Sequence, residues 1–114
     1  MNISEPTYFV LAALLDGPRH GYDIASEATD LSGGRVKLSA GTLYGALDRL
    51  NNAGQIEPDH EETVNGRLRR YYRITNDGAQ LVVAESERMS QAAAVVKNRQ
   101  PVKLGSLNLK GGAA

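Results

Sequence analysis

A chain of 114 residues is long enough for one domain with a modest hydrophobic core and is rarely long enough for two. The 13 basic and 13 acidic side chains balance, and the absence of cysteine excludes a disulfide framework and a cysteine zinc site. No apolar stretch reaches membrane-spanning length, and no charged segment followed by an apolar run opens the chain. We therefore expect a cytoplasmic protein without membrane contact.

The first predicted helix covers residues 5 to 16, EPTYFVLAALLD. Ser4, followed by a glutamate and Pro6, is a typical helix opening, and the Asp-Gly-Pro sequence at 16 to 18 ends the helix. Apolar side chains surround this helix almost completely, so it should be buried on more than one side. Because a small domain seldom covers such a helix alone, the pattern indicates a partner subunit.

A second, more polar helix is predicted over residues 20 to 30, and Ser-Gly-Gly at 32 to 34 ends it. Its inward-facing set is Ile24, Ala25, Ala28 and Leu31.

A third helix is predicted from Ser39 to Asn52, with Ser39 as the N-cap and Gly54 in the C-cap region. Its apolar face consists of Leu43, Ala46, Leu47 and Leu50. The other faces carry small hydroxyls and an aromatic ring at the front of the helix and an arginine further along, which suits contact with a DNA groove. These candidates are Ser39, Thr42, Tyr44 and Arg49. Two alternatives stay open, because Ser39 can serve as a cap alone and Arg49 can pair with acids near Asp48.

A β-hairpin is predicted after Gly54, because Asn65-Gly66 separates two segments of period two, residues 56 to 64 and 67 to 75. On the second segment an apolar face, interrupted only by Arg70, alternates with a cationic one. The apolar face carries Leu68, Tyr72 and Ile74, and the cationic face carries Arg67, Arg69, Tyr71 and Arg73.

Two interpretations of these arginines remain open. In one, they form a solvated strand face neutralised by acids of the partner strand, namely Glu57, Asp59, Glu61 and Glu62. In the other, Arg67 and Arg69, which lie nearest the turn, contact DNA phosphates or the minor groove, whereas Arg73 is structural.

A fourth helix should open at Thr75-Asn76-Asp77-Gly78 and reach about Arg99, before Pro101. Val82, Met89 and Val96 are spaced by seven residues, which keeps them near one stripe of the helix. The stripe can belong to the core of a monomer or to a dimer interface. Residues 101 to 114 lack the apolar density needed to become ordered.

Three stretches together resemble the PadR family of transcriptional regulators: HGYDI at 20 to 24, GTLYGALDRLNNAGQIE at 41 to 57, and RRYYRITNDG at 69 to 78. The resemblance covers residues 4 to about 99 and implies a mainly α fold with a small β-hairpin. Its parts are a winged helix-turn-helix domain at 1–75, a dimerisation helix at 76–100 and a flexible tail at 101–114. Gly45 departs from the family, which usually has proline there, and Gln55 stands where an apolar residue is common.

The resemblance implies a repressor that binds a pseudo-palindromic operator in double-stranded DNA as a homodimer, with no cofactor. It adds Tyr22, at the start of the second helix, to the DNA-contacting residues; packing against the first helix is the other interpretation of Tyr22. It also implies a pocket for a flat, apolar inducer between the first and fourth helices at the dimer interface. The predicted walls are Tyr8, Leu11, Leu15, Met89, Ala92, Ala93 and Val96. A packed dimer seam without a cavity is the alternative.

Other classes of function fit the sequence less well. It contains no Gly-rich phosphate loop, no HExxH and no serine elbow, so we do not expect an enzyme. His20 and His60 lack cysteine partners and lie far apart in the sequence, so we expect no metal site. A winged-helix module that binds a protein instead of DNA is the alternative function, but such a module has no need for arginines clustered beside tyrosines.

Overall fold

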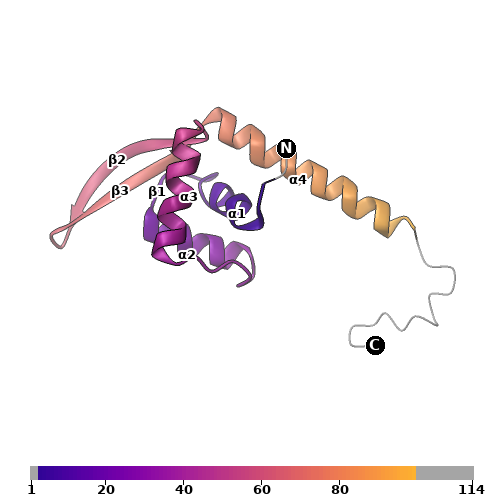
Figure 1. Ribbon diagram of the computed structural model, residues 1–114, viewed down its shortest axis with the longest axis horizontal. Helices are drawn as coiled ribbons and strands as arrows, with labels where there is room; N and C mark the ends of the chain where they lie inside the picture. Colours follow the sequence, from indigo (N-terminus) through magenta and orange to yellow (C-terminus); the bar gives the residue numbers. More distant parts are fainter. Residues whose placement is uncertain (1–2, 100–114) are drawn as a thin grey trace.

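The computed structural model describes residues 3–99, which form four helices and a three-stranded antiparallel sheet (Figure 1). In chain order the elements are α1 (Glu5–Ala13), β1 (Arg19–His20), α2 (Gly21–Leu31), α3 (Ala40–Asn52), β2 (Ile56–Val64), β3 (Arg67–Ile74) and α4 (Asn76–Lys97). The predicted mainly α fold with a small β-hairpin is confirmed. The predicted tail, 101–114, lies outside the described residues. In the described part of the chain, no helix has the length and apolar character required to span a membrane.

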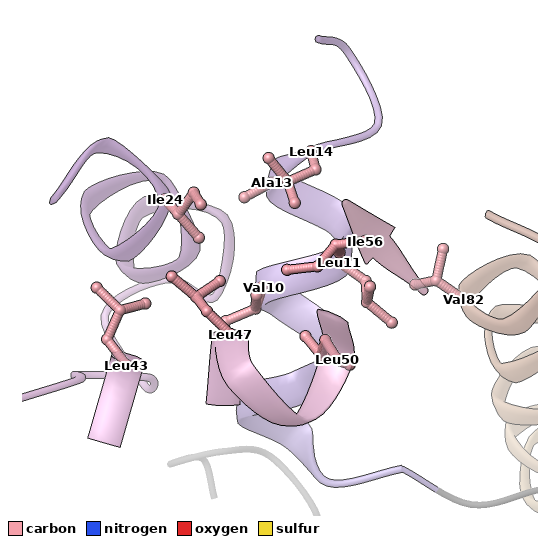
Figure 2. Close-up of a cluster of buried hydrophobic side chains, with 10 residues drawn as sticks. All are labelled: Val10, Leu11, Ala13, Leu14, Ile24, Leu43, Leu47, Leu50, Ile56 and Val82. Carbon is pink, nitrogen blue, oxygen red and sulfur yellow. The ribbon is translucent and has the colours of Figure 1, made fainter. Parts of the chain in front are cut away.

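The core lies where α1, α2, α3, the base of the sheet and the start of α4 meet (Figure 2). It contains Val10, Leu11, Ala13, Leu14, Ile24, Leu43, Leu47, Leu50, Ile56 and Val82. The apolar face predicted for α3 is confirmed, since all four of its residues are buried. The segment predicted as the first helix is less covered than expected, because Leu15, which lies just beyond the end of α1, remains 50% exposed in the single chain.

The first helix opens as predicted and ends three residues earlier than predicted. Ser4 is its N-cap, and the Ser4 hydroxyl accepts a hydrogen bond from the backbone N–H of Thr7 at 3.2 Å. After Ala13 the chain tightens into a turn, in which the N–H of Leu14 bonds to the carbonyl of Leu11 at 3.1 Å. The Arg19 Nε donates to the Ala13 carbonyl at 2.8 Å, which satisfies the end of the helix.

The prediction of which α2 residues face inward is correct for Ile24 and Ala28, which are fully buried. It is wrong for Leu31, which is 48% exposed. Leu31 is the last residue of the helix and lies beyond the edge of the core. In the loop that follows, Val36 is buried. The hydroxyl of Thr29 holds this loop by donating to the Val36 carbonyl at 2.7 Å.

The sheet has the order β1-β3-β2, and its first strand was not predicted. β1 contains only Arg19 and His20, which pair with Tyr72 and Tyr71 of β3. The β2–β3 hairpin is confirmed: Asn65 and Gly66 both have positive φ angles, 52° and 78°, as a two-residue hairpin turn of type I′ requires. We call this hairpin, residues 56–74, the wing.

The fourth helix begins against the loop that enters the wing and then leaves the body of the domain (Figure 1). Thr75 is its N-cap and accepts from the backbone N–H of Gly78 at 3.1 Å. A Cβ atom at Gly78 would lie 2.0 Å from the carbonyl oxygen of Gln55, so only glycine fits this approach. Val82 and Glu85 are the last buried residues, and residues 86–99 are all exposed in the single chain.

Candidate nucleic-acid interface

A concave surface of about 500 Å³ lies between the start of α2, the front of α3 and the wing. We call it the interface groove. Its lining residues are His20, Gly21, Tyr22, Tyr44, Arg67, Leu68, Arg69 and Arg70. The fold therefore brings four of the seven predicted DNA-contacting residues together from three elements that are distant in sequence. Two of them are strongly exposed, Tyr22 at 79% and Tyr44 at 52%.

Tyr44 reaches the groove by lying across the first residue of α2. A Cβ atom at Gly21 would lie 2.8 Å from the hydroxyl oxygen of Tyr44 and 3.1 Å from the adjacent ring carbon. The glycine of the HGY stretch thus leaves room for the Tyr44 ring. Sequence reasoning missed this role, because nothing local to Gly21 indicates which ring will pack on it. Tyr22 points to solvent, and its extreme exposure argues against the alternative of packing on α1.

Ser39 and Thr42 stand at the exposed N-terminus of α3, outside the groove lining. The Ser39 hydroxyl accepts from the Thr42 N–H at 3.3 Å and donates to the Thr42 hydroxyl oxygen at 3.0 Å. The predicted cap is therefore confirmed. In this arrangement the Thr42 hydroxyl accepts from Ser39, so its own proton stays available to an external acceptor.

Arg49 lies on the exposed face of α3 near Gly45, where an added Cβ atom would be 3.6 Å from its Nη1. Within residues 3–99, no ion pair joins Arg49 to an acidic side chain, so the predicted alternative of pairing near Asp48 is not seen. The absence of proline at position 45 leaves α3 unbroken through this point.

The four wing arginines divide into two paired and two unpaired side chains. Arg73 binds Glu57 and Asp59 through contacts of 2.8 and 2.9 Å, and Arg70 binds Glu61 at 3.3 Å. The two ion pairs agree with the structural role predicted for Arg73. Arg67 and Arg69, by contrast, form no ion pair with any acid in the described part of the chain. The neutralised strand face is therefore seen for Arg70 and Arg73, whereas the DNA contact of Arg67 and Arg69 stays a prediction.

The fourth acid of β2, Glu62, is held by other partners. The Nε2 of His60 lies 3.1 Å from Oε2 of Glu62, and the Tyr71 hydroxyl donates to Oε1 at 3.1 Å. The Nδ1 of His60 lies 2.5 Å from Oδ2 of Asp59. Hydrogen bonds to Asp59 and then to Glu62 raise the pKa of His60, and the same bonds to His60 lower the pKa values of both carboxyl groups.

Both histidines lie against one aromatic ring, although they are distant in sequence. The imidazole of His60 stacks on Tyr71 with ring centroids 4.2 Å apart, and His20 of β1 approaches the same ring edge-on at 5.3 Å. No group of three metal-ligating side chains gathers in the described residues. The histidines therefore belong to the aromatic and carboxylate contacts of the wing.

The predicted inducer walls are brought together only in part. A groove of about 260 Å³ between α1 and α4 is lined by Tyr8, Ala12, Leu15, Val82, Val83, Ser86 and Glu87. Tyr8 and Leu15 were predicted, whereas Leu11 lies in the core instead. Met89, Ala92, Ala93 and Val96 are farther along α4, outside this groove and exposed in the single chain.

Comparisons with known proteins agree with this fold. Residues 10–84 match the model of the transcriptional regulator PadR-like family. A PadR family transcription regulator from Clostridium difficile R20291 has a TM-score of 0.69 at 22% identity, over 83% of this chain and 97% of that one. Bacillus subtilis PadR in complex with operator DNA has a TM-score of 0.60 at 24% identity, over 68% of this chain and 44% of that one.

A further relative is the uncharacterized 37.1 kDa protein in transposon TN4556 of Streptomyces fradiae, which is 37% identical over 91 residues. The match covers 80% of this chain but spans only 25% of that relative's length.

Proposed function

The chain belongs to the PadR-like family of transcriptional regulators, and we propose that it binds double-stranded DNA in a sequence-specific manner and represses transcription. The observation that carries this proposal is the interface groove, in which the exposed rings of Tyr22 and Tyr44 face a wing with two unpaired arginines. A solved structural neighbour, the Bacillus subtilis PadR, binds operator DNA.

In the proposed complex, α3 enters the major groove and the wing follows the adjacent backbone. Thr42 and Tyr44 are exposed at the front of α3, where recognition helices contact base edges. Arg67 and Arg69 meet phosphates or the minor groove, and Arg49 meets a phosphate two turns into the helix.

We further propose a homodimer built on α4. Every residue from 86 to 99 is exposed in the single chain, and the exposed set includes Met89, Val95 and Val96. A helical segment of this length with so little tertiary packing is marginal in water, so a second copy would stabilise it. Two-fold symmetry would place two α3 helices in successive major grooves, about 34–36 Å apart, on a pseudo-palindromic operator. Such a dimer represses by blocking polymerase.

An inducer site at the α1–α4 groove is part of the proposal. Tyr8 supplies a ring and a hydroxyl there, beside the half-exposed Leu15 and Val83. A second copy packed along α4 would add Met89, Ala92 and Val96 to the walls. A flat, apolar molecule in this seam would change the spacing of the two α3 helices and release the operator.

Selection of bound sequences from random duplex DNA with the purified protein tests the main proposal. We expect enrichment of an inverted repeat whose half-sites are about one helical turn apart. Binding without any sequence enrichment, or no binding, would contradict the proposal and favour a winged-helix module that contacts a protein.

A further inference from the structure

The acids of β2 face the cationic strand β3, yet Arg69 remains unpaired although Glu62 lies directly opposite it. Glu62 and Arg69 are cross-strand Cα partners in the antiparallel ladder. Oppositely charged partners at such positions attract each other, so an ion pair is the expected arrangement. The structure instead shows the Glu62 carboxylate turned along the strand, towards His60 and Tyr71.

The contacts of His60 identify the protonation state that this arrangement requires. Both ring nitrogens lie within hydrogen-bond distance of a carboxylate oxygen, Nδ1 at 2.5 Å from Asp59 and Nε2 at 3.1 Å from Glu62. A carboxylate can only accept, and a neutral imidazole has a single N–H. Two such contacts at once therefore need the doubly protonated imidazolium. The raised pKa of His60 agrees with this conclusion.

Loss of the proton would break one of the two contacts. The shorter contact, to Asp59, would keep the remaining N–H, since Asp59 is itself fixed by Arg73 at 2.9 Å. The bare Nε2 would then face a carboxylate and repel it. Only the Tyr71 hydroxyl would still hold Glu62, which lies opposite the unpaired Arg69.

We propose that His60 and Glu62 are positioning residues for the DNA-contacting arginine Arg69. With His60 charged, Glu62 is held by His60 and Tyr71, interacts with Arg69 only through a weaker charge attraction, and leaves Arg69 available for a phosphate. With His60 neutral, Glu62 pairs with Arg69 across the strands and competes with DNA. The inference rests on the proposed DNA binding, and it makes operator affinity rise as the pH falls through the titration of His60.

Other charged and titratable groups also surround the imidazole, from β1, β2, β3 and α3. They are His20, Asp48, Asp59, Glu61, Glu62, Arg69, Arg70, Tyr71 and Arg73. Among these, Asp59 and Glu62 contact the ring nitrogens directly, while Glu61 and Arg70 are occupied with each other at 3.3 Å. His20 is a second histidine, and it approaches the same Tyr71 ring edge-on. The test must therefore separate the contribution that passes through Glu62 from that of His20.

Operator affinity is measured at constant ionic strength at about pH 6 and about pH 8, the range in which histidine titrates. If one phosphate contact per chain is lost at the higher pH, a dimer loses two contacts. Each contact contributes about 0.9 to the exponent with which the binding constant depends on salt, so at about 0.15 M salt the dimer should bind about 30-fold more weakly. Glu62→Gln should bind tightly at both pH values, because its amide does not neutralise Arg69. His60→Gln should bind weakly at both.

The double variant His60→Gln/Glu62→Gln separates positioning from structural damage. If His60 acts through Glu62, the double variant should recover the affinity of Glu62→Gln. If the lost ring stack on Tyr71 merely weakens the wing, the double variant should stay as weak as His60→Gln, and the inference is overturned.

Glu61→Gln is the matched control, since it removes an acid of the same strand that does not contact His60; it should keep the pH dependence. If Glu61→Gln lost the pH dependence to the same extent as Glu62→Gln, the effect would come from net charge alone and the inference would be overturned.

A measurement on the free protein distinguishes this inference from the proposed function. The ¹⁵N shifts of the His60 ring and of the Arg69 Nε are followed against pH by NMR. We expect a lower His60 pKa in Glu62→Gln than in the wild-type protein, and an Arg69 shift that follows His60 only when Glu62 is present. Failure of the wild-type protein to bind duplex DNA at any pH would overturn the proposed function. Unchanged NMR titrations in Glu62→Gln would overturn the His60–Glu62–Arg69 coupling even if DNA binds.

Discussion

Replacing both unpaired wing arginines with alanine should weaken binding to all duplexes alike and flatten its salt dependence. Arg67 and Arg69 break no intramolecular ion pair when they meet a phosphate, so each can contribute a full contact. Two contacts per chain give four per dimer, and at about 0.9 each the slope of log K against log salt should fall by about 3.6. Between about 50 and about 200 mM salt the wild-type protein should therefore lose affinity about 150-fold more than the variant.

The assay is a titration of fluorescent duplex at several salt concentrations, with the selected operator and with a random sequence. Arg73→Gln is the matched control: it removes the same charge from the same strand, but that charge is already neutralised at 2.8 and 2.9 Å, so the slope should stay near the wild-type value. Tyr44→Ala should instead reduce the difference in affinity between the operator and random DNA. A double arginine variant with the full salt slope, or an equal loss in Arg73→Gln, would refute the assignment of the wing contact.

Three further predictions concern stability, assembly and ligand. Gly78→Ala should destabilise the fold by about 3 kcal/mol in chemical denaturation, because the added Cβ atom would overlap the Gln55 carbonyl. Gly41→Ala, whose added Cβ atom would have no neighbour within 4 Å, should be neutral or stabilising. Met89→Glu should give a monomer or a poorly folded chain, and a sedimenting dimer would contradict the α4 interface. Flat aromatic compounds should release the operator from the wild-type protein and not from Tyr8→Ala/Met89→Ala; release that survives this double change would place the site elsewhere.

The elements that sequence predicted correctly are those whose signals are local. Ser39 and Thr75 cap helices because each hydroxyl accepts a hydrogen bond from a backbone N–H only three residues away. Asn65-Gly66 defines the hairpin because few other dipeptides adopt two successive positive φ angles. The apolar period of α3 identifies its buried face without reference to any other element. In each case a few neighbouring residues carry all the information needed.

The features that sequence missed depend on where distant segments meet. β1 has two residues and no period, and it is a strand only because Tyr71 and Tyr72 offer it a partner. Leu31 continues the apolar period of α2 but lies past the edge of the core, which no local pattern reveals. Likewise, the role of Gly21 depends on the ring of Tyr44 that crosses it.

Which wing arginines stay unpaired depends on a register shift in β2. The ladder shifts by one residue between Pro58 and His60, so that Glu57 faces Arg73 on one side of the shift and Glu62 faces Arg69 on the other. Alternation alone predicted a cationic face and an acidic face and left their pairing open. Only the shift decides that Arg73 receives two carboxylates, while the acid opposite Arg69 is drawn to His60.

This pairing explains how a chain without net charge can present a cationic surface. Exposed charges are screened beyond about 10 Å at ordinary salt, so the acids elsewhere in the chain have little effect at the wing tip. The acids that matter are those of β2, and they neutralise Arg70 and Arg73 near the body while leaving Arg67 and Arg69 unpaired. A wing with four unpaired arginines would hold any duplex through its phosphates and would reduce the advantage of the operator. By confining the unpaired charge to two side chains in the same groove as Tyr44, the acidic strand would keep the proposed backbone contact next to the residues that we propose read bases. Neutralising Glu57 and Glu61 together should therefore raise affinity for random DNA more than affinity for the operator, and equal gains on both would show that the acidic strand has no part in specificity.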